Sequence, residues 1–107
     1  LYTSIVAVLC VPELRDALER APGMIVQVAN LATEDETNGH DGTEHLAAVR
    51  AHGGRVDVFM YDPDNGLAVD PDEVAALGVQ PLPVAIARPH GWGHDPLQLA
   101  KALSALL

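Results

Sequence analysis

The sequence predicts a three-layer α/β fold, in which a parallel β-sheet is flanked by helices. Three apolar runs with the composition of strands begin near residues 24, 56 and 79. Segments with helical periodicity and helix caps lie between them, and a strand, a helix and a strand at this spacing form a βαβ unit with parallel strands. The length of 107 residues and the hydrophobic fraction of 49 % suit one small domain.

The first elements are expected to be packing elements. Residues 1–9 are apolar apart from Tyr2, Thr3 and Ser4, and this pattern fits a strand or a helix. Pro12 then opens an amphipathic helix that ends at residues 22–23, a Pro-Gly pair. Its apolar stripe recurs at helical spacing and consists of Leu14, Ala17, Leu18 and Ala21.

A strand, a long polar loop and a helix follow in residues 24–45. The apolar run stops at Asn30, and Thr43 is the expected cap of a helix that begins with Glu44 and His45 and ends at residues 53–54. This helix is expected to bury Leu46, Ala47 and Val49. Open α/β sheets bind ligands outside the carboxyl ends of their strands, so a polar loop there indicates a site, although solvation alone also explains its composition.

The second and third strands complete the predicted sheet. Residues 56–60 form one strand, and the turn-rich loop 61–66 should open on the same edge as the first polar loop. Asp70 and Pro71 begin a short helix that Gly78 closes. In the run 79–87 two prolines remove ladder donors, which predicts an edge strand or a strand that begins near Val84. Asp95 caps the last helix, whose expected buried stripe is Leu99, Ala102, Leu103 and Leu106.

Charge and composition exclude several classes of partner. Fifteen acidic residues against six basic ones give a formal net charge of −9, which argues against binding to nucleic acid or to an acidic membrane. No apolar stretch approaches the ~20 residues of a membrane-spanning helix. Cys10 is alone, so neither a disulfide nor a cysteine metal set is expected. A cytoplasmic protein is the simplest interpretation.

Three groups of residues contain the side-chain types of a metal site or a catalytic site. His40, Asp41, Glu44 and His45 contain metal-ligand types, but acidic residues near a helix amino terminus are favourable without an ion, and no metal site is expected. Glu36 and His45 would act as an acid/base pair only with a substrate between them. A triad with Ser4 is set aside because the sequence has no G-x-S-x-G elbow.

Three ordered motifs resemble one family. N-L-A-T at 30–33, E-T-N-G at 36–39 and E-H at 44–45 are similar to N-[VI]-M-T-Q-x-G-E-T-D-G-x-x-x-x-[DE]-H of the YvcK-type gluconeogenesis factors (UPF0052-like), relatives of the CofD phospholactate transferases. L-Y-T-S-I at 1–5 with V-P at 11–12 resembles the family's S-L-Y-T-S-I…L-V-P segment. H-D-P at 94–96 with L-A-K-A-L at 99–103 resembles its R-H-D-x-x-K-L-A-x-A-[IL] segment.

The resemblance implies a Rossmann-like fold and a ligand. Family members are longer, so residues 1–107 would be a single α/β segment, the carboxy-terminal part of a larger domain. The missing amino-terminal part of the same fold would then be a partner of this segment. Association of several copies into a homo-oligomer is also expected. A nucleotide-sugar such as UDP-N-acetylglucosamine would bind at the carboxyl edge and control carbon flow into cell-wall precursors, and thereby cell shape. The implied ligand residues are Thr3, Ser4, Asn30, Thr33, Glu36, Thr37, His45 and, as an aromatic platform, Tyr61.

Departures from the family pattern keep two alternatives open. Glu34 replaces an amide, and Gly93 stands where an Arg commonly precedes the His-Asp pair, so phosphate donors are lost. One alternative is a CofD-like enzyme that transfers a phospho-acyl (2-phospholactate) group and needs metal ligands outside this chain. The other is a structural segment that completes another chain's fold.

Overall fold

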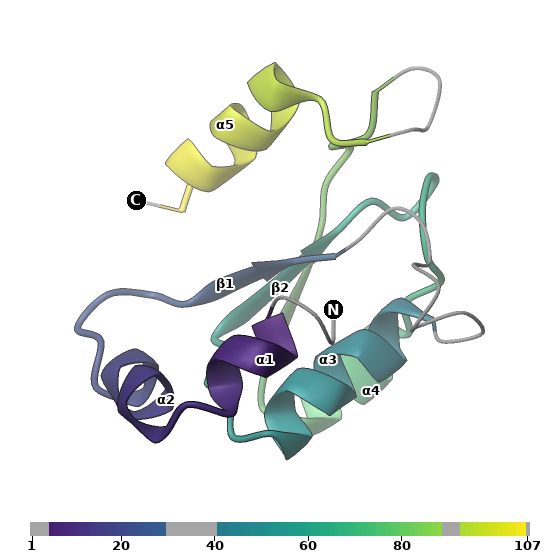
Figure 1. Ribbon diagram of the computed structural model, residues 1–107. Coiled ribbons are helices and arrows are strands. Elements are labelled where there is room, and N and C mark those ends of the chain that lie inside the picture. Colours follow the sequence, from purple (N-terminus) through teal and green to yellow (C-terminus); the bar gives the residue numbers. More distant parts are fainter. Residues whose placement is uncertain (1–4, 30–40, 89–92, 107) are drawn as a thin grey trace.

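A three-stranded parallel sheet in the order β1-β2-β3 forms the centre of the molecule (Figure 1). The computed structural model describes residues 5–29, 41–88 and 93–106. The strands are β1 (Val26–Val28), β2 (Val58–Tyr61) and β3 (Gln80–Pro83). Val26 pairs with Val58, and Val58 pairs with Gln80. Every β2 side chain is buried, as expected for the central strand of a sheet that is covered on both faces.

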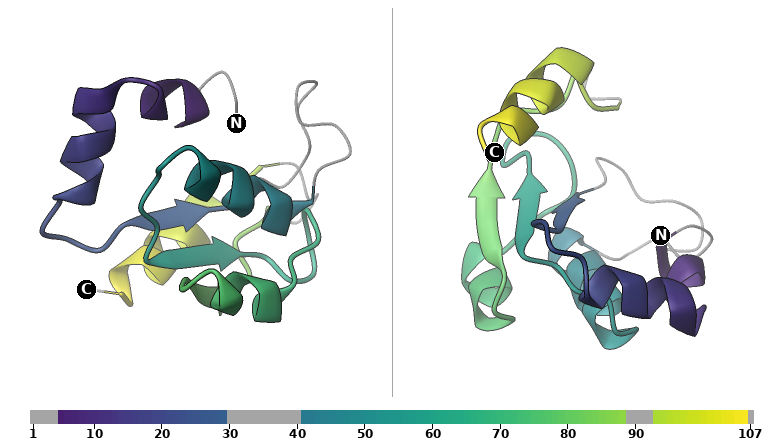
Figure 2. Two further views of the ribbon diagram at one scale, coloured as in Figure 1. Left: turned by 90° about the horizontal axis from the view of Figure 1, so that it is seen from below. Right: turned by 90° about the vertical axis from the view of Figure 1, so that its left-hand side faces the viewer.

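Helices cover both faces of the sheet, and this confirms the predicted α/β class. They are α1 (Ile5–Leu9), α2 (Pro12–Glu19), α3 (Gly42–Ala51), α4 (Pro71–Ala76) and α5 (Pro96–Ser104). Helices α1, α3 and α4 lie side by side on one face in that order, while α5 lies across the other face (Figures 1 and 2). The layers are therefore helix, sheet and helix.

The core is divided by the sheet into two unequal clusters. The larger one lies under α1, α3 and α4 and is built from Leu9, Ala29, Leu46, Val49, Val56, Phe59, Tyr61, Val74 and Val79. The smaller one lies under α5 and consists of Met60, Ile86 and Ala102, with partly buried neighbours. Most of the buried apolar surface is thus on the α3 face.

An ion pair fastens the amino ends of β1 and β2. The Asp57 carboxylate accepts a hydrogen bond from the backbone N–H of Ile25 at 2.7 Å and pairs with the Arg55 guanidinium at 2.9 Å. Arg55 also donates to the carbonyls of Ala21 and Gly23. The Ile25 N–H, and then Arg55, hold the pKa of Asp57 below its ordinary value. Asp57 therefore stands directly before the apolar strand β2 because its carboxylate joins this strand to β1.

The predicted apolar stripes of three helices are only partly buried. No residue of α2 is buried, Leu14 is 47 % exposed, and Leu18 is the stripe residue that packs on the core. Ala47 of α3 and Leu103 of α5 are exposed as well. These predictions were wrong because a stripe is buried only where another layer lies against it, and the described residues place none there.

Helix starts and the third strand differ from the prediction in detail. Asp41, not Thr43, caps α3, so the helix begins at Gly42. The predicted edge strand is confirmed, but its alternative start near Val84 is wrong because β3 begins at Gln80. The N–H groups of Gln80 and Val84 donate to Asp57 and Tyr61 of the β2 segment. The intervening prolines face away from β2, so no ladder bond is lost.

Candidate functional site at the carboxyl edge of the sheet

The start of α3 and the loop after β2 form one hydrogen-bonded unit at the carboxyl edge. The N–H of Gly42 donates to the carbonyl of Ala68 at 2.7 Å, and the N–H of Asp70 donates to Oγ1 of Thr43 at 2.8 Å. A Cβ on Gly42 would lie 2.6 Å from Cγ2 of Val69, so glycine is required for this close approach. The first polar loop, residues 30–40, lies outside the described residues, so its predicted meeting with the loop 61–66 stays a prediction.

The first turn of α3 is held by its own cap. Oδ1 of Asp41 accepts a hydrogen bond from the N–H of Glu44 at 2.7 Å. Glu44 is exposed, and a negative charge at a helix amino terminus is favourable. Asp41 therefore acts as the helix cap, while Thr43 holds the neighbouring loop.

Asp62 joins the loop after β2 to the segment after β3. Its Oδ1 accepts the N–H groups of Asp64 and Asn65, and its Oδ2 accepts those of Ile86 and Ala87, all at 3.0–3.1 Å. Burial of this carboxyl, which is 4 % exposed, raises its pKa, but the four N–H donors outweigh burial and hold the pKa of Asp62 below its ordinary value. The carboxylate is thus a fixed anionic anchor between two loops.

A hollow of about 450 Å³ opens beside this anchor, between the end of β2 and the start of α4. Tyr61, Asp62, Asp64 and the segment 66–69 line it. Tyr61 is only 6 % exposed, and its ring stacks on Phe59 with centroids 6.3 Å apart. Tyr61 is therefore largely a core residue that also borders the hollow.

The segment before α5 forms the other flank of the edge. Nε2 of His94 donates to the carbonyl of Ala29 at the end of β1, at 3.0 Å. His94 also forms a bridge with Ala87, and Nε of Arg88 donates to the His94 carbonyl at 3.2 Å. His94 thus connects the ends of β1 and of the α5 segment, and Arg88 is used to hold that loop.

Two of the predicted ligand residues lie at this edge. His45 is in the first turns of α3 and is 2 % exposed, and Tyr61 ends β2. The other six predicted ligand residues lie outside the described residues; they are Thr3, Ser4, Asn30, Thr33, Glu36 and Thr37. His40, one of the four residues with metal-ligand types, also lies outside them. Within residues 5–29, 41–88 and 93–106, no three His, Cys, Asp or Glu side chains are grouped to hold a metal ion.

The sequence interpretation missed Asp62 and His94 as organising residues of the edge. Asp62 directly follows the buried run of β2, and an acidic residue in that place is the signal that could have indicated it. His94 stood inside a matched family segment, but its contact with Ala29, 65 positions away in sequence, has no local signature. No helix in the described part of the chain is long and apolar enough to cross a membrane.

The parallel sheet, its two helical layers and its loop-lined carboxyl edge define an α/β protein of the Rossmann-like class. The model of the family "2-phospho-L-lactate transferase CofD" matches residues 1–81. The chain therefore belongs to the CofD family.

Two further proteins are similar to this chain. A protein of Deinococcus radiodurans named "Putative gluconeogenesis factor" is 39 % identical over 56 residues, which are 51 % of this chain and 12 % of that protein. A crystal structure of a UPF0052 family member from Bacillus halodurans superposes with a TM-score of 0.79 at 23 % identity and covers 90 % of this chain. The chain spans 37 % of that structure, which shares its fold.

Proposed function

We propose that this protein binds a nucleotide-sugar of the UDP-N-acetylglucosamine type at the carboxyl edge of its sheet. In this proposal it acts in the cytoplasm as a ligand-sensing regulator of central carbon metabolism and of cell-wall precursor supply. Within the family, the relative that bears the gluconeogenesis factor name supports the metabolic part of the proposal.

The observation that carries the proposal is the arrangement of the edge. β1 ends at Val28, α3 begins at Gly42, and the loop after β2 is hydrogen-bonded to that helix start. Ala29 and Asp41, the described residues on either side of the segment from which most of the expected ligand residues come, both lie at the edge where parallel sheets bind nucleotides. His45 and Tyr61 belong to the same edge.

The chemistry of the hollow suits the sugar part of such a ligand. Carboxylate and carbonyl oxygens are hydrogen-bond acceptors, and a sugar offers hydroxyl donors. Asp64 is exposed and lines the hollow, and Asp62 is fixed as an anion by its four N–H donors. An acidic wall repels a diphosphate, so in this proposal the phosphates lie toward the start of α3 and the polar segment 30–40.

Calorimetric titration tests the proposal on the complete polypeptide in which these residues occur. UDP-N-acetylglucosamine is the ligand, GDP is the comparison, and Thr37→Ala is the variant. Ser104→Ala, an exposed position at the end of α5, is the matched control. We expect saturable binding of the UDP-sugar alone, weakened roughly tenfold or more by Thr37→Ala and unchanged by Ser104→Ala, as for the loss of one ligand hydrogen bond.

The second candidate function is phospho-acyl transfer of the CofD type, and the family match over residues 1–81 favours it. Binding of GDP without binding of the UDP-sugar would discard the sensing proposal and support this one. A transferase of this kind uses a metal ion, and the described residues do not form a ligand set for one. Its metal ligands would therefore come from segments other than these.

A further inference from the structure

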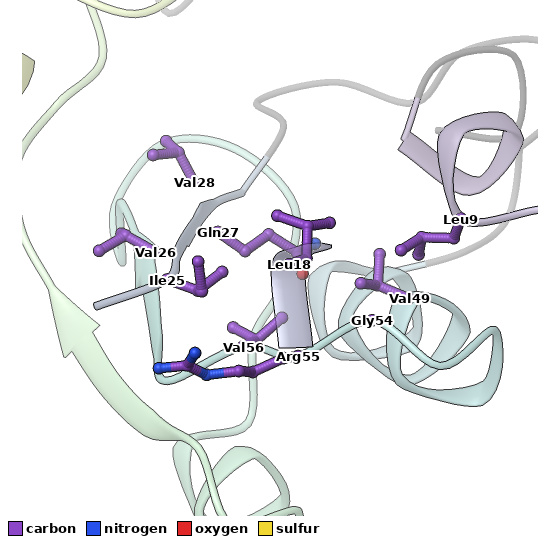
Figure 3. A pocket seen from close by; sticks show the side chains of 10 residues that line it. All are labelled: Leu9, Leu18, Ile25, Val26, Gln27, Val28, Val49, Gly54, Arg55 and Val56. Atoms are coloured by element: carbon purple, nitrogen blue, oxygen red, sulfur yellow. The ribbon is translucent and has the colours of Figure 1, made fainter. Parts of the chain in front are cut away.

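Among the described residues, Asn65 is the side-chain amide that lies in a loop. The other described amides are glutamines in regular elements, namely Gln27 in β1, Gln80 in β3 and Gln98 in α5. Gln27 is 9 % exposed and lies among the apolar side chains that line a hollow of about 300 Å³ (Figure 3). Asn65 is instead exposed in the loop after β2. Asparagine is a thermolabile residue type, so its surroundings decide whether it reacts.

Gly66, the next residue, has a backbone nitrogen that can act as a nucleophile. Its N–H donates no hydrogen bond to a described residue, and the residue is exposed. Its φ of 118° lies in a region that glycine adopts without strain. Because glycine has no Cβ, no side chain shields this nitrogen. The nitrogen is therefore accessible to the amide carbon of the preceding side chain.

The side chain of Asn65 is unattached, whereas its backbone is fixed. The side-chain amide makes no hydrogen bond to a described residue, so it can rotate toward Gly66. The backbone N–H of Asn65 donates to Oδ1 of Asp62 at 3.1 Å. Asp62 thus holds the peptide group before Asn65 in place, and leaves the side chain and the following peptide nitrogen able to meet.

We propose that Asn65 is a site of spontaneous deamidation in the folded protein, at which an amide is converted into a carboxylate without an enzyme. The backbone nitrogen of Gly66 attacks Cγ of Asn65, and the new C–N bond closes a succinimide ring. The bond from Cγ to the side-chain nitrogen breaks. This nitrogen leaves as ammonia, which carries away the proton of the Gly66 N–H, and water then opens the ring.

Ring opening gives two products. Water that breaks the bond between Cγ and the Gly66 nitrogen leaves an aspartate at position 65. Water that breaks the bond between the backbone carbonyl carbon of residue 65 and the same nitrogen leaves an isoaspartate, whose backbone runs through the side chain and is one atom longer. Both products add a negative charge to the loop that lines the hollow of about 450 Å³, beside Asp62 and Asp64.

The longer backbone of the isoaspartate matters because the loop is fixed on both sides of Asn65. Before it, Asp62 accepts the N–H groups of Ile86 and Ala87 at 3.0 Å. After it, the carbonyl of Ala68 accepts the N–H of Gly42 at 2.7 Å. An additional backbone atom between these two points changes the length that the loop must span, so it weakens the contact with α3. This inference is independent of the ligand that binds at the carboxyl edge.

Peptide mapping by mass spectrometry tests the inference on the complete polypeptide. The tryptic peptide that contains Asn65 has no other asparagine, and Asn65→Ser is the control that must remove its deamidated form. The protein is incubated at mildly alkaline pH, both folded and unfolded in guanidinium chloride. We expect the folded rate to be within roughly tenfold of the unfolded rate, because the reaction needs no opening of the loop. A greater slowing in the folded protein would overturn the inference.

Thermal unfolding gives a second readout, on the effect of the longer backbone. Freshly prepared Asn65→Asp is the matched control, because it carries the added charge at normal backbone length. We expect the incubated wild type, once mapping shows isoaspartate at the site, to have a Tm at least about 2 °C below that of Asn65→Asp. Incubated Asn65→Ser should keep its initial Tm. A smaller difference between the first two proteins would overturn the inferred effect on the loop.

Discussion

At the scale of single residues, Asp62 is the side chain on which the carboxyl edge depends most. Its two oxygens accept four backbone N–H groups from two different loops. Because these donors are backbone groups of fixed position, an acceptor oxygen is required on each side of the carboxyl group.

Asp62→Asn retains the shape of the side chain but replaces one acceptor with an NH₂ donor. Two N–H groups would then lose their partner and meet a donor instead. We expect a loss of about 2–3 kcal/mol in the free energy of unfolding, the cost of buried groups left unsatisfied. Urea unfolding measures it, with the exposed Asp64→Asn as the control, which should change stability by less than about 0.5 kcal/mol. Equal effects of the two variants would argue against the anchor.

Low pH should destabilise the protein through Asp62 and Asp57. The N–H donors of Asp62 and the Ile25 N–H beside Asp57 hold both pKa values below the ordinary value of 3.8. The unfolded chain then binds more protons than the folded one below about pH 4, so the stability that these carboxylates contribute is present above that pH and is lost as the pH falls.

The measurement is the urea midpoint between about pH 5 and pH 3, where the linkage acts. We expect it to fall over this range in the wild type, and to fall less in Asp62→Asn, which has no carboxyl group to protonate at that position. A midpoint with the same pH dependence in both proteins would show that Asp62 does not contribute.

At the scale of elements, α3 is fixed against the loop after β2 by a contact that only glycine permits. A Cβ at position 42 would lie 2.6 Å from Cγ2 of Val69 and 3.1 Å from the Ala68 carbonyl. We expect Gly42→Ala to destabilise the protein by about 1–3 kcal/mol, the usual range for overpacking. Thermal or urea unfolding checks the value.

Gly23→Ala is the matched control for this substitution. A Cβ there would meet no atom within 4 Å, and the effect should stay within about 0.5 kcal/mol. In the proposed function, Gly42→Ala also weakens binding of the UDP-sugar, because it moves the start of α3 away from the loop. A variant as stable as the control would contradict the close contact at Gly42.

The elements also show what the sequence could predict. Strands, helices and the caps Asp70 and Asp95 have local signals, and the structure contains them. The sequence predicts Thr43 as the cap of α3, although Thr43 and Asp41 are both residue types that cap helices well. Only the tertiary bond from the Asp70 N–H engages Thr43 and leaves the cap to Asp41. The anchors of the edge come from such long-range contacts, which periodicity does not contain.

At the scale of the whole molecule, the two faces of the sheet contribute unequally to stability. Leu46 of α3 is fully buried in the larger cluster, whereas Leu103 of α5 is 38 % exposed. We expect Leu46→Ala to reduce the free energy of unfolding by about 2–5 kcal/mol and Leu103→Ala by less than about 1 kcal/mol. Urea unfolding of both variants decides, and a larger effect at Leu103 would contradict the division of the core.

The two edges of the sheet also determine how copies of the chain can associate when the outer edge of β1 is unpaired. Addition of molecules into a growing ladder needs two compatible edges on each copy. Of the two edge strands in the described part of the chain, β3 carries outward prolines and β1 does not, so β1 is the one that can accept a strand. Two copies that meet through β1 use the same surface on each, which closes the assembly as a two-fold pair. Association of copies through the edges of the described sheet therefore closes as a pair and does not propagate into fibres.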